Sequence, residues 1–508
     1  MAMSKLEIPK EVADICKKLE EADFEAYLVG GWVRDILLNR EPKDWDITTN
    51  AKPEQVQKIF PDSAYENKFG TVAVKTRSEN EKLKIIEITT FRIEGKYTDK
   101  RHPDEVKFAK TVEEDLSRRD FTINAIAVRV NGKSKMEKGK TETKSIIHYP
   151  LSIELTDPFD GQEDTKNKII KTVGKSSDRF NEDALRMMRA VRFAAELGFE
   201  IDKKTEDAIK KEAGLIEMIA KERIRDEFTK LVMAPGAMKG IEKLEELGLL
   251  KLIMPELREG IGVTQDKHHI YTVWEHNLRA LDYTVKKNYS LEVRLAALFH
   301  DLGKPKTKAG KSPNSTFYNH EMVSAKMAAK ILDRLHFSNS IVEKVIHLVR
   351  YHMFYYNVGE VTEAGVRRFL ARVGPENIDD FIKIREADRI GSGVPKAVPY
   401  KLRHLLFMID KVKRDPISPK MLKINGNELM EFLKINPSPR VGWILAALLE
   451  EVIEDPKRNE KEYLENKTKE LNGLSEKELQ RLFEKARESK TEFEGEIEKE
   501  IKRKYYIK

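Results

Sequence analysis

The pattern of hydrophobic and polar positions changes character near residue 180. Before that point, short apolar runs predict β-strands at 26–29, 45–48, 71–76, 85–91 and 123–130. An amphipathic helix is expected over 5–27, and a second over 53–60, which opens with a proline in its first turn. The alternation predicts an α+β domain, with a small mixed sheet covered by helices on one side.

From residue 181 onward, apolar residues recur at i, i+3 and i+4, which is typical of helices. The predicted helices are 181–197, 203–213, 219–232, 236–248, 273–288, 291–300, 320–335, 340–352, 363–373, 377–387 and 398–414. The polar, lysine-rich segment 131–156 is expected to be an exposed hairpin or insertion. After residue 456, Lys and Glu dominate, which favours a long solvated helix or a helical pair. An extended all-helical region should therefore follow the α+β head.

The composition fits several domains with a strongly solvated surface. The chain has 508 residues, of which 40% are hydrophobic and 35% charged, with a net charge of +7. This charge permits a nucleic-acid partner without requiring one, and a Lys/Glu-rich surface of the thermophile kind explains it equally well. The single cysteine, Cys16, excludes a disulfide within the chain and a cysteine-based zinc site.

No segment resembles a targeting or membrane-spanning sequence. The first ten residues lack the apolar core of a signal peptide, and the apolar run 441–449 is too short to span a bilayer. We therefore expect a cytoplasmic protein without membrane association, whose oligomeric state the sequence leaves open.

The first group of candidate functional residues follows the strand at 26–29. Gly30 and Gly31 would let the backbone approach a phosphate, with the N-terminus of a helix behind them. Asp44 and Asp46 lie two residues apart on the next strand, so their carboxylates should share a face and suit Mg²⁺. Glu87 is a candidate third ligand, although a lone strand glutamate often faces solvent. The pattern indicates metal-assisted transfer from a nucleoside triphosphate, against the alternative of an acidic strand edge.

A second group precedes the strand expected at 123–130. Arg118 and Arg119 could clamp a triphosphate through paired hydrogen bonds. Asp120 and Asn124 could hold ribose hydroxyls. The alternative for this segment is a set of ordinary surface salt bridges.

A third group recurs every three residues, so its members should lie along one helix face: Asp183, Arg186, Arg189 and Arg192. A charged stripe of internal ion pairs is one interpretation. The other is base recognition, since cytosine and adenine both present an amino donor beside a ring-nitrogen acceptor. Asp183 could accept from the amino group while Arg186 donates. Guanine and uracil would leave both groups mismatched, which is costly in a buried site.

These three groups, in this order, resemble the bacterial-type (class II) tRNA nucleotidyltransferases and the related poly(A) polymerases. Segments 101–106, 157–161 and 222–228 extend the likeness, which covers about residues 26–265. The resemblance implies a polymerase-β-like head in which Asp44 and Asp46 bind Mg²⁺. It also implies that Asp183 and Arg186 act as a protein template for CTP and ATP, and that later residues cradle tRNA.

The same resemblance distributes the remaining roles in nucleotide binding. Gly30, Gly31 and Arg34 would serve the triphosphate, while Arg119, Asp120 and Asn124 would serve the sugar and phosphate. Arg189 and Arg192 continue the nucleotide-binding helix. Residues 92–115 are where we would expect a loop that switches between C and A addition.

A second site is indicated within the helical region. Its residues are histidines and aspartates on separate predicted helices: His276, His300, Asp301, His320, His352 and Asp388. Imidazole and carboxylate together suit a divalent transition metal. The order resembles that of the HD phosphohydrolase superfamily, which implies an all-helical domain and leaves the metal and any hydrolytic substrate open.

The sequence thus predicts an enzyme that adds C, C and A to tRNA from CTP and ATP. The alternatives are a poly(A) polymerase or an enzyme that adds only CC or only A. From a different class, the HD domain could be a metal-dependent phosphohydrolase with the head serving RNA recognition. A purely RNA-binding protein would have no use for the metal ligands. Four segments are expected: a head at 1–155, a neck at 156–265, an HD domain at 266–395 and a helical body and tail at 396–508.

Overall fold

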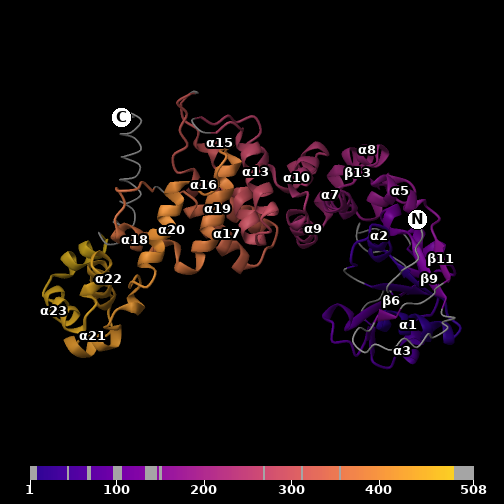
Figure 1. The fold of residues 1–508 in the computed structure, drawn as a ribbon, viewed down its shortest axis with the longest axis horizontal. Helices are drawn as coiled ribbons and strands as arrows, with labels where there is room; N and C mark the ends of the chain where they lie inside the picture. Colours follow the sequence, from indigo (N-terminus) through magenta and orange to yellow (C-terminus); the bar gives the residue numbers. More distant parts are fainter. Residues whose placement is uncertain are drawn as a thin grey trace. The chain divides into compact units, whose positions relative to one another are not determined.

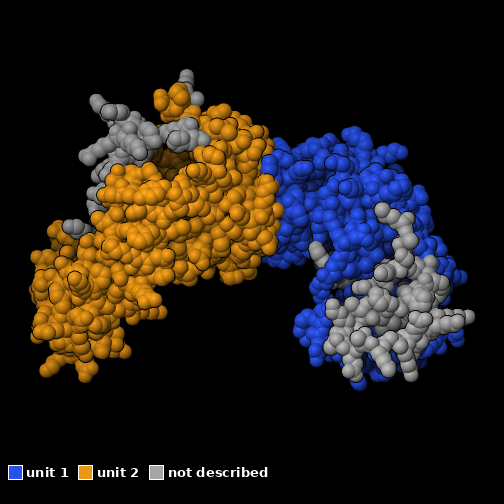
Figure 2. Space-filling view, in the orientation of Figure 1, with its two compact units in different colours: residues 1–258, 333–337 blue, residues 259–332, 338–508 orange. Residues whose placement is uncertain are grey.

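The computed structural model describes residues 8–42, 45–65, 70–94, 106–131, 146–147, 152–266, 269–310, 313–353 and 356–484. The chain forms two compact units, which Figure 2 colours separately. The first comprises residues 1–258 and 333–337, and the second comprises 259–332 and 338–508. Each unit is described by itself below.

A seven-stranded mixed sheet forms the base of the first unit, in the order β11-β9-β2-β3-β6-β5-β4. Only β3 and β6 pair in parallel among these neighbours. The strands are β2 (Ala26–Val29), β3 (Asp46–Thr49), β4 (Ser63–Tyr65), β5 (Thr71–Lys75), β6 (Ile85–Thr90), β9 (Ala127–Asn131) and β11 (Ser152–Thr156). Smaller two-stranded sheets are formed by β1 (Ile8–Pro9) with β10 (Ile146–Ile147), and by β7 (Arg92–Glu94) with β8 (Val106–Phe108).

The prediction of a strand over 123–130 is wrong for the first half of that range. Residues Thr122–Asn124 form a 3-10 turn, η2, and the strand β9 begins only at Ala127. This turn places the Asn124 side chain among the polar groups described below. The segment 131–156 ends in β11, which pairs antiparallel with β9 as expected of a hairpin.

Helices cover both faces of the sheet, and β2 carries apolar side chains on each face. Leu28 packs with Val12 of α1 (Lys10–Glu21) and Val56 of α3 (Pro53–Ile59). Val29 points to the opposite face and packs with Leu116 of α4 (Val112–Ser117). The expectation of helices on one side is therefore wrong. Figure 1 shows this part of the chain in indigo and purple.

The remainder of the first unit is largely helical, as predicted. Its further helices are α2 (Gly31–Leu37), α5 (Gly161–Asn167), α6 (Ser176–Glu182), α7 (Leu185–Leu197), α8 (Lys203–Glu212), α9 (Lys221–Met233), α10 (Ala237–Glu246), α11 (Leu250–Ile253) and α12 (Pro255–Arg258). The parallel pair β12 (Ile169–Ile170) and β13 (Glu200–Ile201) joins them. Helix α7 packs against α9 and α10. The helix predicted at 181–197 is two helices, because Asp183 has extended backbone angles of φ −142° and ψ 104°.

Every described element of the second unit is a helix or turn. The helices are α13 (Val273–Lys286), α14 (Leu291–Phe299), α15 (Lys304–Thr307), α16 (His320–Arg334), α17 (Asn339–Tyr351), α18 (Glu363–Val373), α19 (Ile378–Gly391), α20 (Tyr400–Val412), α21 (Gly426–Leu433), α22 (Pro439–Glu454) and α23 (Lys461–Asn472). The end of α16 belongs to the first unit. Figure 1 draws these helices in pink to yellow.

The charged C-terminal segment is less solvated than its composition indicates. Leu464 and Leu471 of α23 are buried against Leu429 of α21 and Leu448 of α22. These leucines recur at helical spacing, so α23 presents one apolar stripe to a local core. Residues 485–508 lie outside the described part of the chain. No described helix combines the length and apolar character needed to cross a membrane.

Replacing Gly161 by alanine should destabilise the first unit. A Cβ there would lie 2.2 Å from the Thr122 carbonyl oxygen and 2.8 Å from Cγ1 of Ile126. Backbone atoms cannot move aside cheaply, so we expect a loss of roughly 1–3 kcal/mol in unfolding free energy. Denaturant titration measures it. Gly214, whose Cβ would meet no atom within 4 Å, provides the matched control. Equal stability of both variants would contradict this packing.

Candidate functional site

Gly30, at the end of β2, lies between two functional groups. It has a positive φ of 82°, and a Cβ there would lie 3.2 Å from Nη1 of Arg119 and 3.4 Å from Oδ2 of Asp46. Strand pairing sets Asp46 opposite Val29 and beside Glu87 of β6. Glycine is needed because any side chain would fill this space. Asp44, the predicted partner of Asp46, lies outside the described residues.

The face of the sheet at Asp46 fits a hard divalent cation. Neighbouring residues in register on paired strands project to the same face, so Asp46 and the exposed Glu87 lie on one side of the sheet. Carboxylate oxygens are the ligands that Mg²⁺ prefers, and the glycine leaves an open approach. The donor chemistry of these residues therefore suits the predicted metal.

A buried carboxylate holds the two arginines of the second group. Asp115 accepts from Nε and Nη2 of Arg118 at 3.0 and 2.8 Å, and from Nη2 of Arg119 at 3.4 Å. Burial alone would raise the pKa of Asp115, but Arg118 and Arg119 bring it below its ordinary value. Asp115 is therefore charged and fixes both guanidinium groups. Sequence reasoning missed it, although its i, i+3 and i+4 spacing to the arginines was a signal.

Asp120 joins the head to helix α7. Its carboxylate accepts from Nε and Nη2 of Arg189 at 2.8 and 2.6 Å, and from Nδ2 of Asn124 at 3.1 Å. Asn124 in turn accepts from Nη1 of Arg34 at 2.9 Å, and Arg34 is paired with Asp35 at 2.7 Å. Burial acts against the charge of Asp120, but Arg189 and Asn124 lower its pKa to about 2. Asp120 is therefore ionised at neutral pH.

Three arginines of the site surround one aromatic ring. The guanidinium carbons of Arg34, Arg189 and Arg192 lie 5.3, 5.3 and 3.9 Å from the ring centroid of Phe193. Glu227 of α9 lies 2.7 Å from Nε of Arg192. The aromatic face and the carboxylate together stabilise the crowded positive charges. Sequence reasoning assigned no role to Phe193 or Glu227, although Glu227 lay within a segment it had singled out.

These groups line a pocket of about 660 Å³. Its walls include predicted residues from each of the first three groups: Gly30, Gly31, Arg34, Asp46, Arg119, Asp120, Asn124, Arg189 and Arg192. Asp46 and the four arginines named here therefore face one cavity. Its size and the arginines in its lining suit a nucleoside triphosphate.

The predicted base-reading pair lies in an adjoining pocket of about 260 Å³. Asp183 accepts from Nη1 and Nη2 of Arg223 at 3.1 and 2.7 Å. Arg186 contacts Glu182 at 2.5 Å and donates to the Arg118 carbonyl at 3.1 Å. The expectation that Asp183 shares the helix face is wrong, since α7 begins at Leu185. Both side chains nevertheless line the same pocket. Arg223 was not assigned a role from the sequence.

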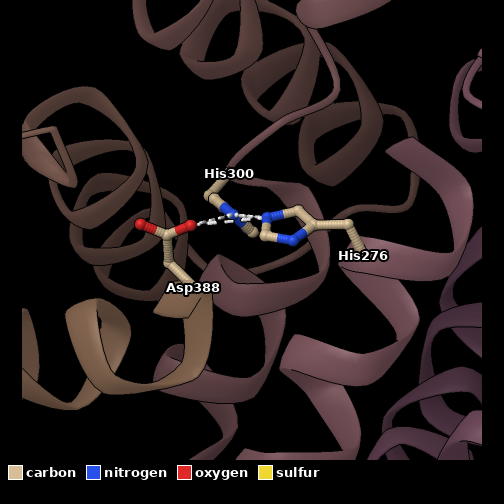
Figure 3. A group of neighbouring side chains, drawn as sticks. All are labelled: His276, His300 and Asp388. Atoms are coloured by element: carbon tan, nitrogen blue, oxygen red, sulfur yellow. Dashed lines mark hydrogen bonds and ion pairs between the residues drawn. The ribbon is translucent and has the colours of Figure 1, made fainter. Parts of the chain in front are cut away.

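The second unit brings all six predicted histidines and aspartates into one cluster. His276 lies on α13, His300 and Asp301 follow α14, His320 opens α16, His352 follows α17, and Asp388 lies on α19. Two sets of possible metal ligands share His300, with ligand atoms within 4.8 Å of one another: His276, His300 and Asp388, and His300, Asp301 and His352. Figure 3 shows the first set, with both imidazoles directed toward the carboxylate.

The hydrogen bonds of the cluster fix the tautomers of three imidazoles. Nδ1 of His300, His320 and His352 lies 2.8, 2.7 and 2.7 Å from a backbone carbonyl oxygen. A carbonyl only accepts, so each Nδ1 carries the proton and each Nε2 presents a lone pair. Nε2 of His320 then faces Oδ1 of Asp301 at 3.2 Å, and these two acceptors need a proton or a metal ion between them. The cluster therefore fits a metal.

Burial and charge keep His276, His352 and Asp301 in metal-binding form, whereas the pKa of His300 is raised because its burial is outweighed by Asp301 and Asp388. Burial lowers the pKa of His276, and it holds that of His352 well below the ordinary value, so both are neutral at pH 7. Burial alone would raise the pKa of Asp301, but Lys304 and His300 bring it well below its ordinary value. Nζ of Lys304 lies 2.5 Å from Oδ2 of Asp301. Lys304 received no role in the sequence analysis.

Comparisons with known proteins agree with this arrangement. Three family models match the chain: the poly A polymerase head domain over residues 26–171, the probable RNA and SrmB-binding site of polymerase A over 198–261, and the HD domain over 273–390. The fold and sites thus define a nucleotidyltransferase with an attached HD domain.

Individual relatives narrow the class. A CCA-adding enzyme of Geobacillus sp. is 34% identical over 453 residues, which cover 88% of this chain and 93% of the relative. An enzyme of that name from Listeria monocytogenes is 42% identical over 268 residues, covering 53% of this chain but only 61% of the relative. An A-adding tRNA nucleotidyltransferase of Deinococcus radiodurans is 36% identical over 361 residues, covering 68% and 76%. The chain belongs to the tRNA nucleotidyltransferase family of the CCA-adding enzymes.

A solved structure supports the assignment over nearly the whole chain. The crystal structure of the Bacillus stearothermophilus CCA-adding enzyme in complex with CTP has a TM-score of 0.65 and 29% sequence identity. The match covers 91% of this chain and 97% of that one.

Metal binding by the HD cluster should stabilise the second unit. Adding Mn²⁺, Ni²⁺ or Zn²⁺ to chelator-treated protein at 100 times the Kd should contribute about 2.7 kcal/mol, raising the thermal midpoint. The effect should weaken as the pH falls, because protons compete with the metal for the imidazoles. His276 and His352 protonate only below the ordinary range of a histidine, because burial lowers the pKa of each. Differential scanning calorimetry measures it. Replacing His300 and Asp301 by alanine should remove the effect, while His336→Ala should retain it. A metal response in the first variant would place the site elsewhere.

Proposed function

We propose that this protein adds C, C and A to the 3′ end of tRNA, using CTP and ATP. The observation that carries the proposal is the convergence of Asp46, Gly30 and Arg119 on the pocket that Asp120 and Arg189 also line. The relatives whose names describe CCA addition support the same activity. The tRNA 3′-hydroxyl attacks the α-phosphate of the nucleotide, and pyrophosphate leaves.

The residues of the first pocket divide the binding of the triphosphate among them. Asp46, with Asp44, would hold Mg²⁺, which neutralises charge on the triphosphate and the leaving pyrophosphate when bound. Gly30 and Gly31 admit the phosphates close to the backbone, and Arg119 lies beside them. Asp120 and Asn124 hold Arg189 and Arg34 in place and offer oxygen atoms toward the sugar. Catalysis on this account comes mainly from positioning and electrostatics.

Asp183 and Arg186 read the base. Asp183 is paired with Arg223 and Arg186 with Glu182, so each group holds a partner that a base can replace. Cytosine and adenine supply an amino donor to Asp183 and an acceptor to Arg186. Guanine and uracil place a carbonyl acceptor opposite Asp183 and an N–H donor opposite Arg186. Leaving a buried charged group mismatched costs about 1.5–3 kcal/mol, enough for strong discrimination.

Two narrower activities remain as alternatives. The Deinococcus relative bears the name of an A-adding enzyme, so addition of A alone is the first. Poly(A) synthesis is the second, since the matched head family is named for that polymerase. The full CCA activity is favoured by the Geobacillus relative, whose match spans most of both chains.

We further propose that four segments share the work in the cytoplasm. Residues 1–155 carry the chemistry, 156–265 read the nucleotide, 266–395 form the metal-dependent HD domain, and 396–508 contact tRNA. This division is supported by the succession of the three matched family models along the chain.

Product length on a tRNA that lacks its terminal CCA tests the activity. With CTP alone the product should grow by two residues, and with CTP and ATP together by three. Electrophoresis at single-nucleotide resolution measures this. Failure to use CTP, or tails of many A residues, would contradict the proposal.

Asp46→Asn should reduce nucleotide addition by roughly 100-fold or more, equivalent to at least about 2.7 kcal/mol of transition-state stabilisation. The amide keeps the shape but removes the negative charge that holds the metal. The rate of single-nucleotide addition gives the measurement. Asp178→Asn, on the exposed side of α6, should leave the rate unchanged. Retained activity in the Asp46 variant would show that the metal site is misassigned.

Asp183→Ala should lower the preference for CTP and ATP over GTP and UTP by roughly 10- to 100-fold, because one charged hydrogen bond to the base is lost. Competition between the four nucleotides in kcat/KM measures the preference. Unchanged selectivity would mean that the base is read by other residues.

A further inference from the structure

Asp115 of α4 lies outside both pockets that the nucleotide-binding residues line. It is fully buried, and it is not among the described residues that form either cavity. Besides its two arginines, its carboxylate accepts from the backbone nitrogen of Arg92 at 3.3 Å, and Oγ1 of Thr48 lies 3.5 Å from it. The carboxylate therefore joins β3, the start of β7 and the end of α4. A bound nucleotide is out of its reach, so Asp115 can act on the nucleotide only through its partners.

Arg119 carries the influence of Asp115 to the triphosphate end of the site. Its Nη2 donates to Oδ2 of Asp115 at 3.4 Å, and its Nη1 lies 3.2 Å from the position of a Cβ on Gly30. Oδ2 of Asp46 lies 3.4 Å from that same position. A guanidinium group is planar and rigid, so holding one nitrogen directs the other. Asp115 therefore sets where Arg119 can meet the triphosphate.

Arg118 carries the influence of Asp115 to the base end of the site. Its Nε and Nη2 both donate to Oδ1 of Asp115, which closes the side chain over the end of α4. The last carbonyls of a helix have no intrahelical donor, and two of them accept from arginines here. The Arg118 carbonyl accepts from Nη2 of Arg186 at 3.1 Å, and the Ser117 carbonyl accepts from Nη1 of Arg179 at 3.2 Å. The position of Arg186 thus depends on the part of α4 that Asp115 holds.

One buried charge therefore holds both ends of the nucleotide site. Burial acts against the ionised form of Asp115, but Arg118 and Arg119 lower its pKa below the ordinary value. The side chains of these arginines are only 16% and 18% exposed, so solvent screens the ion pairs weakly. The spacing between the triphosphate contact and the base contact is thus set before a nucleotide binds, which lowers the ordering cost of binding.

We propose that Asp115 is a positioning residue that fixes the spacing between Arg119 and Arg186, and that this spacing determines the selection of CTP and ATP. The proposal rests on the roles of Arg119 and Arg186 in the proposed function. A nucleotide gains the full affinity only when its base meets Arg186 while its triphosphate meets Arg119. Loss of the spacing should therefore weaken CTP more than UTP, whose base opposes Arg186 in any case.

Calorimetric titration of the full chain with Mg²⁺ and CTP, UTP or inorganic tripolyphosphate tests the proposal. In Asp115→Asn, the ratio of the UTP Kd to the CTP Kd should fall by at least about tenfold, the effect of one charged hydrogen bond. Tripolyphosphate, which meets only the triphosphate end, should weaken less than CTP. Glu113→Gln, on the exposed side of α4, is the matched control and should change none of the three.

A double-variant comparison separates positioning from a purely structural role. Asp115→Asn should no longer change the CTP to UTP ratio in a protein that already carries Arg186→Gln, because it acts through that arginine. Asp115→Glu provides a second variant that keeps the charge and hence the fold. Its longer side chain shifts the arginines, so it should bind tripolyphosphate as wild type does while the CTP to UTP ratio stays reduced. A merely structural ion pair would be restored fully by glutamate.

Three results would overturn the proposal. They are an unchanged CTP to UTP ratio in Asp115→Asn, an equal loss of affinity for all three ligands, and full restoration of the ratio in Asp115→Glu. These measurements contain no tRNA, so failure of the proposed function appears separately, as wild-type protein that binds CTP but does not extend tRNA. Wild-type protein that binds CTP no better than UTP would overturn both the base-reading role of Arg186 and this proposal.

Discussion

The arrangement of the first unit depends on the buried carboxylate of Asp120. It receives two hydrogen bonds from Arg189 of α7 and one from Asn124, which in turn holds Arg34 behind the glycines. Removing one partner of such a buried ion pair typically costs about 3–5 kcal/mol, which is a large part of the unfolding free energy of a protein. The same contact ties the turn before β9 to helix α7, and residues of both line one pocket. Stability and the proposed function thus rest on the same few charged groups.

Much of this site could be predicted from the sequence because its residues lie in short local patterns. The glycines after β2, Asp46 on β3 and the arginines of α7 are each marked by strand or helix spacing. The partners of these residues could not be found in this way. Glu227 and Arg223 reach the site from α9 only through the packing of α9 on α7. The backbone break at Asp183 was missed because local propensity there favours a continuous helix.

The HD cluster shows the same division between local and long-range information. All six ligand candidates were recognised from their order, and the structure brings them together from five helices and the turns that follow them. The sequence could not reveal that three backbone carbonyls fix the imidazole tautomers, because each carbonyl, three residues before its histidine, contacts the ring only when the chain is folded. Nor could it place Lys304 against Asp301.

The most direct test of the account is a crystal structure of this chain with bound CTP. The account predicts that Asp183 exchanges Arg223 for the exocyclic amino group of cytosine, while Arg186 donates to the ring acceptors and the triphosphate lies along Gly30 and Arg119. A structure in which the base lies away from both residues, with Asp183 still paired to Arg223, would contradict it.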